Sequence, residues 1–433
     1  MKKVYTVFTT EILHNVHIEV IKKAAELGEL TVGIYSDNAL EQLGRVPIMK
    51  QEQRVVVFGA LQGVAHVVLQ KEISYVKNLN TLKPDIVVRG NNWDNPRGST
   101  LDFMQIRQEI IDTLAQWGGK LVEIPYTQIK TDEIISKISY NSYLPEVRRR
   151  KLNYLINSKP IVRIIEAHNG LTGLIAEHTN INVNGEDKNF HGMWVSSLCD
   201  STAKGKPDIE LVDHTSRLET IEQIMDITTK PIILDGDSGG QTGHFVHNIK
   251  TIERSGVSAI IIEDKIGLKA NSLFGIAGGQ EQDTIEGFQN KIAEGKKALT
   301  SKEFRMIARI ESLILKKGLE DALTRAKAYI DAGVDGIMIH SNQKDPTEIL
   351  AFCDKFAAFK TVPLVTVPTT YNTITEDELA KRGVNIVIYA NHLIRAAFPA
   401  MQNTAISILK HGRSKEADDM LMSIKDVISL IPK

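Results

Sequence analysis

Residues 231–240 read PIILDGDSGG, an apolar run that ends in two carboxylates and two glycines. The run predicts a buried strand, and side chains two apart in a strand point to the same side. Asp235 and Asp237 are therefore expected to leave the strand end as one pair aimed at a common point. Two acids so close repel each other unless a cation lies between them. Mg²⁺ suits this place because it prefers a few carboxylate oxygens and keeps positions for other ligands. A strand capped by turn-forming acids is the alternative interpretation.

The same pattern of an apolar strand, a polar residue at its end and a helical stretch recurs along the chain. The expected strands are residues 161–168, 192–197, 231–235, 258–263, 306–311, 336–340, 362–367 and 385–391. Eight such units over roughly 275 residues are typical of a (β/α)₈ TIM barrel, whose reactive groups lie at the carboxyl ends of the strands. A doubly wound open sheet would also fit the alternation. The regular spacing favours the closed barrel.

Length and composition bound the class of protein. The chain has 433 residues and a formal net charge of −1, which allows two domains and gives no general attraction to nucleic acid or anionic membranes. Its two cysteines are too few for a disulfide framework and are typical of a reducing compartment. No stretch approaches the roughly 20 apolar residues of a membrane span, and polar residues at 9–11 interrupt the apolar start too early for a signal peptide. We expect a cytoplasmic protein that binds neither nucleic acid nor membrane.

Residues 1–132 are expected to form a domain of their own. Predicted strands alternate here with predicted helices, the strands at residues 4–8, 30–35, 66–69, 85–89 and 120–124 and the helices at 17–27, 51–64 and 103–117. This alternation predicts a Rossmann-like parallel sheet with helices on both faces. Residues 133–158 are expected to be a helical linker to a barrel domain of residues 159–433. The basic run VRRRK in this linker is interpreted as a solvated face.

The N-terminal domain resembles the cytidylyltransferase family that carries an H-x-G-H signature after its first strand. The signature stands here as HNVH at residues 14–17, and YSD at 35–37, QR at 53–54 and RGNNWD at 89–94 lie at family-like positions. The resemblance implies a nucleotide-like site that includes His14, His17 and Arg89. In the family the two histidines cradle phosphates at a helix N-terminus.

Three departures from this family pattern affect the same site. Val16 stands where the family has the glycine that lets the backbone approach the phosphates, and Phe8 replaces the glycine of the strand-end turn. IKTDE at residues 129–133 replaces the hydroxyl-rich helix start of the family with Lys130 and acids, a change that would repel a triphosphate. We therefore expect a retained fold with a spacer, assembly or small-ligand role. A domain that still transfers a nucleotide is the alternative.

The chain from about residue 160 to 432 resembles the phosphoenolpyruvate mutase family of the isocitrate lyase superfamily. The matching stretches are EAHNGLTGLI from Glu166, WVSSLCDSTAKGKPDIE from Trp194, LDGDSGG from Leu234, IIEDKIGLKANSLFG from Ile261, ARIES from Ala308, IMIHS from Ile337 and IYANHLIRAA from Ile388. Fusions of this barrel to a cytidylyltransferase-like domain exist among similar proteins. The resemblance implies a Mg²⁺-dependent interconversion of phosphoenolpyruvate and 3-phosphonopyruvate, the step that makes the carbon–phosphorus bond in phosphonate biosynthesis. It also implies a homotetramer built on exchanged C-terminal helices.

The resemblance further implies roles for individual residues. Asp235 is expected to contact the metal directly, and Asp237, Glu263 and Asp208 to hold it through water molecules. Arg309, an always charged fork of donors, is expected to grip a phosphoryl group or carboxylate, with His340 as a second donor at the far rim. The expected catalytic residues are Asp208, Lys269, Asn271, Arg309 and His340, the expected metal ligands are Asp235, Asp237 and Glu263, and the expected substrate-binding residues are Trp194, Ser196, Ser197, Leu198, Asp235 and Arg309.

The loop after the fourth barrel strand, DKIGLKANSLFG at residues 264–275, separates related activities. Its small and polar residues are expected of a lid that excludes water, because water would hydrolyse a metaphosphate-like species. By resemblance, Lys269 and Asn271 contact substrate in the mutases, whereas phosphonopyruvate hydrolase differs at the asparagine. Lyases of the superfamily carry a catalytic cysteine on this loop, and this loop has none. Three hypotheses stay open: a mutase, a phosphonopyruvate hydrolase, and a nucleotide-binding or nucleotidyl-transferring protein with an auxiliary barrel.

Overall fold

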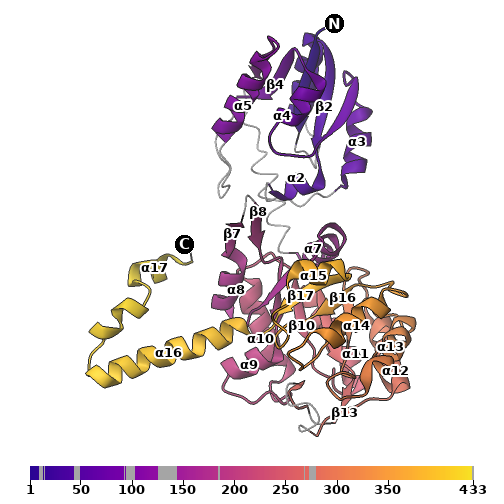
Figure 1. Cartoon of the computed structure of the whole chain (residues 1–433), viewed down its shortest axis with the longest axis vertical. Coiled ribbons are helices and arrows are strands. Elements are labelled where there is room, and N and C mark those ends of the chain that lie inside the picture. The colour runs from indigo at the N-terminus through magenta and orange to yellow at the C-terminus, as the bar shows by residue number, and fades with distance from the viewer. Residues whose placement is uncertain are drawn as a thin grey trace. The chain divides into compact units, whose positions relative to one another are not determined.

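The structure is a computed structural model, which describes residues 1–8, 13, 15–42, 49–91, 93, 103–124, 144–183, 186–267, 269–272 and 279–431. The chain divides into two compact units, residues 1–138 and 139–433 (Figure 1). Both units are α/β, as predicted. The domain limits expected at residues 132 and 159 stay a prediction. In the described part of the chain, no helix is both long and apolar enough to cross a membrane.

The first unit is a five-stranded parallel sheet in the order β3-β2-β1-β4-β5. Its strands are β1 (Lys3–Phe8), β2 (Glu29–Tyr35), β3 (His66–Gln70), β4 (Ile86–Gly90) and β5 (Lys120–Ile124), and its helices are α1 (Asn15–Leu27), α2 (Asp37–Gln42), α3 (Gln51–Gly59), α4 (Val76–Leu82) and α5 (Phe103–Ala115). Every strand predicted for this unit is present. The short helices α2 and α4 were not predicted, since six or seven residues show too little periodicity to be recognised.

The second unit contains a closed parallel barrel, so the open-sheet alternative is wrong. Around the barrel the order is β10-β11-β14-β15-β16-β17-β6-β9, and β17 closes the ring by pairing with β6. The strands are β6 (Val162–Glu166), β9 (Gly192–Val195), β10 (Ile232–Asp235), β11 (Ala259–Glu263), β14 (Arg305–Ile310), β15 (Gly336–Ile339), β16 (Leu364–Thr366) and β17 (Val384–Tyr389). Each coincides with one of the eight predicted strands. Almost every residue of these strands is buried because one face packs inside the barrel and the other against the helices.

Helices surround the barrel, and two short hairpins extend its loops. The helices are α7 (Pro145–Ser158), α8 (Gly170–His178), α9 (Ser197–Ala203), α10 (His214–Met225), α11 (Thr242–Ser255), α12 (Ile285–Ala298), α13 (Gly318–Asp331), α14 (Thr347–Phe356) and α15 (Glu376–Lys381). One hairpin joins β7 (Asn180–Val183) to β8 (Glu186–Asn189), and the other joins β12 (Lys265–Ile266) to β13 (Glu281–Gln282). The second hairpin forms the base of the predicted lid.

Helix α7 corrects the interpretation of the basic run. Leu152, Leu155 and Ile156 of α7 pack into the same apolar cluster as the inward side chains of the barrel strands. Arg148 and Arg149 are buried rather than solvated, because their guanidinium groups donate to backbone carbonyl oxygens of the barrel unit, those of Lys230 and Glu253 respectively. The described part of the expected linker is therefore packed onto the barrel.

The C-terminal segment leaves the barrel as a long helix. It consists of α16 (His392–His411), a 3₁₀ turn at Lys415–Met420 and α17 (Ile424–Ser429). Figure 1 shows α16 extending away from the barrel, and none of its residues is buried. Its first turn is fastened to the barrel, since the amide of Ile394 donates to Glu166 Oε1 at 2.7 Å.

Candidate active site

The DGDSGG stretch turns sharply where the strand ends. Strand β10 ends at Asp235, and Asp237 adopts a left-handed conformation with φ of 52°, which aspartate tolerates better than most residues. The alternation of side chains along β10 therefore stops at Asp235. It is not a valid reason to expect that Asp235 and Asp237 point in the same direction. The turn is closed by hydrogen bonds from the amides of Gly236 and Gly239 to the carbonyl oxygens of Ile261 and Gly236.

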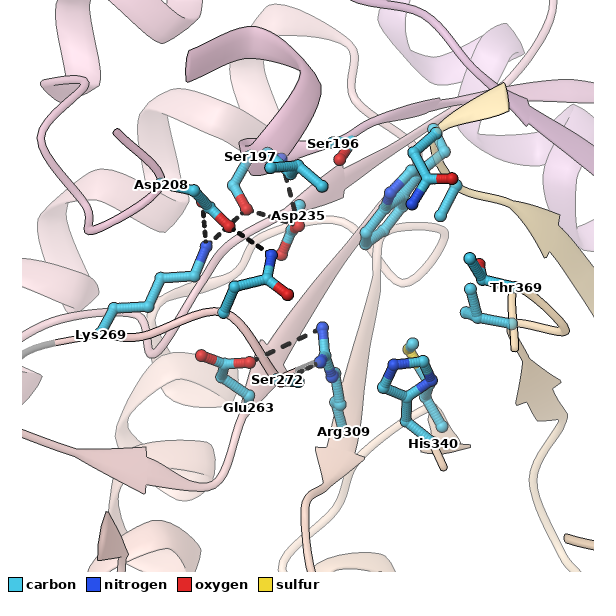
Figure 2. A pocket seen from close by; sticks show the side chains of 17 residues that line it. Ser196, Ser197, Asp208, Asp235, Glu263, Lys269, Ser272, Arg309, His340 and Thr369 are labelled. Atoms are coloured by element: carbon cyan, nitrogen blue, oxygen red, sulfur yellow. Dashed lines mark hydrogen bonds and ion pairs between the residues drawn. The ribbon is translucent and has the colours of Figure 1, made fainter. Parts of the chain in front are cut away.

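One cavity lies at the carboxyl ends of the barrel strands, where the fold class predicts a site (Figure 2). Predicted site residues contribute most of its lining, namely Trp194, Ser196, Ser197, Leu198, Asp208, Asp235, Glu263, Lys269, Asn271, Arg309 and His340. Asp237 does not line the cavity. The remaining lining residues are Ser272, Met338, Val367, Thr369, Ala390 and Asn391.

Asp235 is held from the neighbouring strand-end loop. Its Oδ2 accepts hydrogen bonds from the amide of Ser197 at 3.1 Å and from the hydroxyl of Ser197 at 2.8 Å. Ser197 is the first residue of α9, so the positive end of a helix faces this carboxylate. Within the described residues, Asp235 Oδ1 accepts only a long hydrogen bond, 3.4 Å from the amide of Asp237.

Two cations bind Asp237 instead of leaving it open to the cavity. Arg217 of α10 donates to its Oδ2 at 2.9 Å and to the backbone carbonyl of Asp235 at 3.0 Å. Lys269 donates to Asp237 Oδ1, to Asp208 Oδ1 at 2.7 Å and to the hydroxyl of Ser197 at 2.6 Å. Burial opposes the charge on Lys269, but Asp237, Asp235 and Asp208 outweigh it and raise the pKa of this lysine. Lys269 is therefore a fixed cation.

Asn271 and Ser272 connect the lid to opposite sides of the cavity. Asn271 Nδ2 donates to Asp208 Oδ2 at 2.8 Å, beside the contact of Lys269 with the other oxygen of Asp208. The hydroxyl of Ser272 donates to Glu311 Oε2 at 2.8 Å and accepts from Arg309 Nη2. The lid thus reaches both the aspartate side and the arginine side of the site (Figure 2).

Arg309 forms the cationic side of the cavity. Its Nε donates to Glu311 Oε1, and its Nη1 lies 3.6 Å from Glu263 Oε2. Burial opposes its charge, but Glu311 and Glu263 outweigh that effect and raise its pKa. Burial also raises the pKa of Glu263, while the pKa of Glu311 is lowered because Arg309 and Lys265 overcome the cost of its burial. Glu263 is therefore the carboxylate whose charge is less well balanced.

His340 contributes a neutral ring. Its burial, and then the charge of Arg309, lower its pKa to about 3. A neutral imidazole has one N–H donor and one acceptor, so His340 can donate only one hydrogen bond to a ligand and offers no positive charge. Its Nδ1 is buried and has no hydrogen-bond partner among the described residues.

The donor set fits a hard cation. Across the described ranges, no three His, Cys, Asp or Glu side chains converge as a complete set of metal ligands. Two carboxylates lining the cavity nevertheless have oxygens that are weakly satisfied: Asp235 Oδ1, described above, and Glu263 Oε1, which lies 3.1 Å from Lys265 Nζ but accepts no hydrogen bond. A cation with few protein ligands and several waters suits this arrangement.

Several residues of the site were missed by sequence reasoning. Arg217 comes from the first turn of α10, and no local motif marks it. Glu311, Thr369 and Asn391 follow or end barrel strands, so their strand-end position was an available signal. Lys265 stands inside the quoted lid motif, but the sequence does not show that its side chain turns inward.

The predicted nucleotide-like residues belong to the first unit, and they are described only in part. His14 and residues 129–133 lie outside the described residues. The ring of His17 contacts the ring of Phe8 with centroids 5.4 Å apart. Arg89, at the end of β4, stacks on Trp93 with its guanidinium carbon 3.7 Å from the ring centroid.

The fold and the cavity define a (β/α)₈ barrel with one polar cavity at the carboxyl ends of its strands, lined by three carboxylates and two cations among other side chains. The family described as phosphoenolpyruvate phosphomutase matches residues 152–409. A cytidylyltransferase-like family matches residues 9–136. The chain belongs to the phosphoenolpyruvate phosphomutase family and carries an N-terminal cytidylyltransferase-like domain, so both resemblances are confirmed.

The similar proteins include enzymes with two different activities. A phosphoenolpyruvate phosphomutase from Tetrahymena pyriformis is 37% identical over 294 residues, which are 67% of this chain and 94% of the relative. A phosphonopyruvate hydrolase from Variovorax sp. (strain Pal2) is 37% identical over 285 residues, 65% of this chain and 94% of the relative. A crystal structure of a phosphonopyruvate hydrolase in complex with oxalate and Mg²⁺ is similar with a TM-score of 0.59 and 35% identity, covering 65% of this chain and 94% of that one. The chain is therefore an enzyme of this superfamily that acts on a small molecule.

Proposed function

We propose that this enzyme is a phosphoenolpyruvate mutase, which interconverts phosphoenolpyruvate and 3-phosphonopyruvate. One observation carries the proposal: a single cavity is lined by Lys269 and Asn271 from the lid and by Arg309 from the barrel. The reaction moves a phosphoryl group between oxygen and carbon of one molecule, so the pyruvate enolate and a metaphosphate-like group must be held together. Lys269 and Arg309, on two sides of the cavity, can bind the negative charges of both groups, and the lid can keep water away from them.

The charge of each side chain indicates its role in binding the substrate. Arg309 remains charged and presents a fork of donors, so it binds the phosphoryl group or the carboxylate of the substrate. To do so it exchanges its bond to Ser272 for bonds to the ligand. Lys269 and Asn271 donate from the lid toward the same space, and closure of the lid excludes water from the transferring group. Neutral His340 donates one hydrogen bond at the rim.

We propose Mg²⁺ as the cofactor. Asp235 would hold it directly, and Asp237, Glu263 and Asp208 would hold it through water molecules. For Asp237 a direct contact is disfavoured because Arg217 and Lys269 already bind its two carboxylate oxygens. When bound, the ion supplies Lewis-acid stabilisation of negative charge on the substrate's oxygens. The crystal structure of the hydrolase relative with Mg²⁺ supports this assignment by analogy.

Phosphonopyruvate supplies the direct test of the reaction. Incubated with the enzyme and Mg²⁺, it should give phosphoenolpyruvate in ³¹P spectra, because a closed lid returns the phosphoryl group to oxygen of the same molecule. Inorganic phosphate with pyruvate as the sole products would instead establish a hydrolase.

Phosphonopyruvate hydrolase is the second candidate. It is favoured by the relative from Variovorax, which is as identical to this chain as the mutase from Tetrahymena. The asparagine at position 271, which the resemblance associates with mutases, supports the first candidate.

For the N-terminal domain we propose a retained fold without nucleotidyl transfer. Phe8 is buried, and its ring stacks on Phe58 with centroids 5.5 Å apart while it also contacts His17. This aromatic cluster occupies the end of β1, where a glycine would leave room for phosphates. A nucleotide-binding protein with an auxiliary barrel is the alternative, and domain limits at residues 132 and 159 belong to the same proposal.

We expect no turnover of CTP with 2-aminoethylphosphonate or a phosphorylated alcohol. The filled strand end and the acids at residues 129–133 disfavour a triphosphate. Pyrophosphate release is the measurement, and release at roughly 1 s⁻¹ or faster, a rate typical of enzymes, would contradict the proposal.

We also propose a homotetramer built through the C-terminal helices. Phe398, Met401 and Leu409 of α16 are 61%, 63% and 83% exposed, and large exposed apolar surfaces mark association sites. Light scattering should give the mass of four chains. A monomer at micromolar concentration would contradict the proposal.

A further inference from the structure

Lys265, the first residue of the lid hairpin, is a buried cation between the lid and the site. Its side chain is only 4% exposed. On the barrel side its Nζ lies 3.1 Å from Glu263 Oε1 and 3.6 Å from Glu311 Oε2. These two carboxylates also flank Arg309, so Lys265 shares the counter-charges of the cationic side of the cavity. It does not line the cavity itself.

On the lid side, the same ammonium group donates to both arms of the lid. It donates to the carbonyl oxygen of Ala270 at 3.4 Å and to the hydroxyl of Ser272 at 3.0 Å in the outgoing arm. It also donates to Gln280 Oε1 in the returning arm. Gln280 Nε2 in turn donates to the carbonyl oxygen of Asn271 at 3.2 Å, which joins the two arms.

The base of the lid is held by a separate network. Asp264 Oδ2 accepts hydrogen bonds from Gln282 at 2.8 Å, from Arg325 at 3.1 Å and from Tyr329 at 2.7 Å. These bonds and the backbone pairing of β12 with β13 fix the hairpin without the side chain of Lys265. The contacts of Lys265 with Ala270, Ser272 and Gln280 therefore act further out, on the segment that carries Lys269 and Asn271.

We propose that Lys265 is a positioning residue that latches the lid in its closed position. Hydrogen bonds from an ammonium group are stronger than neutral ones, and low solvent exposure strengthens them further. By holding Ala270 and Ser272, the latch keeps the donors of Lys269 and Asn271 on Asp208. Among the described residues, Gln280 is the one partner of Lys265 that contacts it through a side chain and is neither a carboxylate of the site nor a residue lining the cavity. The inference rests on the proposed function only for its kinetic readout.

Limited proteolysis without substrate tests the latch independently of any turnover. In the closed lid Lys269 is buried and bound by three partners, so trypsin cleaves after Lys269 only when the lid opens. When opening is fast compared with cleavage, the cleavage rate follows the open population. Gln280→Leu removes the hydrogen bond from Lys265 and the hydrogen bond to Asn271, and it should accelerate this cleavage at least about tenfold, the effect of losing one charge-assisted hydrogen bond. Gln280→Glu also loses the donor to Asn271, but it should slow cleavage, because an ion pair with the buried ammonium outweighs one neutral hydrogen bond.

Controls distinguish a latch from general loss of packing. Gln343→Leu changes an exposed glutamine beyond the lid and should leave cleavage after Lys269 as in the wild type. Lys265→Met should accelerate cleavage as Gln280→Leu does, at the cost of a lower melting temperature, so the two Gln280 variants carry the test. Equal cleavage rates for the wild type and both Gln280 variants, or a shift of both variants in the same direction, would overturn the proposal.

Kinetics add a second readout. In phosphonopyruvate turnover, Gln280→Leu should lower kcat and Gln280→Glu should preserve it, with melting temperatures equal to that of the wild type. If the wild type turns over no phosphonopyruvate, the proposed function fails while the proteolysis result still decides the latch. Opposite cleavage shifts with unchanged kcat in both variants would show that lid closure does not serve the chemistry, and would overturn the positioning role.

Discussion

Asp235→Asn is expected to abolish turnover of phosphonopyruvate and the stabilising effect of Mg²⁺ together. The substitution keeps the size of the side chain and an acceptor for Ser197 but removes the charge of the proposed direct metal ligand. Lewis-acid stabilisation of a transition state is worth several kcal/mol, so kcat/KM should fall by at least about 10³-fold. In the wild type, Mg²⁺ at a hundredfold excess over its Kd should add about 2.7 kcal/mol of stability. Melting temperatures measured with and without Mg²⁺ should therefore differ by several degrees in the wild type and not in the variant.

Asp345→Asn is the matched control for this prediction. Asp345 is an exposed aspartate outside the cavity, and its carboxylate contacts only the nearby Thr347 in the described structure. Its substitution should leave both activity and the Mg²⁺ response unchanged. Equal Mg²⁺-induced shifts in the wild type and Asp235→Asn would contradict the metal assignment, whatever happens to activity.

Asn271→Ala is expected to reduce kcat far more than it weakens substrate binding. If Asn271 restrains the transferring phosphoryl group, its bond forms mainly in the transition state. Such a bond is worth roughly 2.7–4 kcal/mol, or about 10²–10³ in kcat, by analogy with oxyanion-hole deletions. The truncated side chain also releases Asp208, which loosens the lid and admits water. A fraction of the product should then appear as pyruvate and inorganic phosphate in ³¹P spectra.

Asn182→Ala is a control with the same chemistry in a different place. Asn182 Nδ2 donates to Asp187 Oδ1 at 2.7 Å on an exposed hairpin, a hydrogen bond much like that of Asn271 with Asp208. Its loss should leave kcat and the product ratio unchanged. A wild-type kcat with only a raised KM in Asn271→Ala would mean that this residue binds substrate in the ground state, and the mutase proposal would then rest on the other motifs alone.

The barrel and the first sheet could be predicted because their signals are local. Each barrel strand is a short apolar run that ends in a polar residue, and burial on both faces makes such runs conspicuous. The same regularity placed the strand-end residues Asp235, Glu263, Arg309 and His340 at one end of the barrel in advance, whereas the other predicted lining residues came from the family resemblance. Lys269 and Asn271 were indicated by the resemblance of the motif after β11 to that of the mutases.

Other features depend on charges that meet only in the folded chain. Whether Asp237 faces a metal or an arginine depends on Arg217, 20 residues earlier on another element. The sequence predicts a solvated basic run at residues 147–151, because sequence alone does not reveal that two of its arginines donate to the carbonyl oxygens of Lys230 and of Glu253 at the end of α11. The balance between Glu263 and Glu311 is set by the positions of Arg309 and Lys265.

The sequence by itself therefore determined the positions of the strands along the chain, the class of the barrel and the kinds of side chain at its strand ends, because periodicity and strand-end position are properties of neighbouring residues. Tertiary structure alone decided which carboxylates remain open to a cation, which are already paired, and that Lys265 joins the lid to the site. Coulomb interactions depend on distance and burial, and neither can be read from positions along a chain.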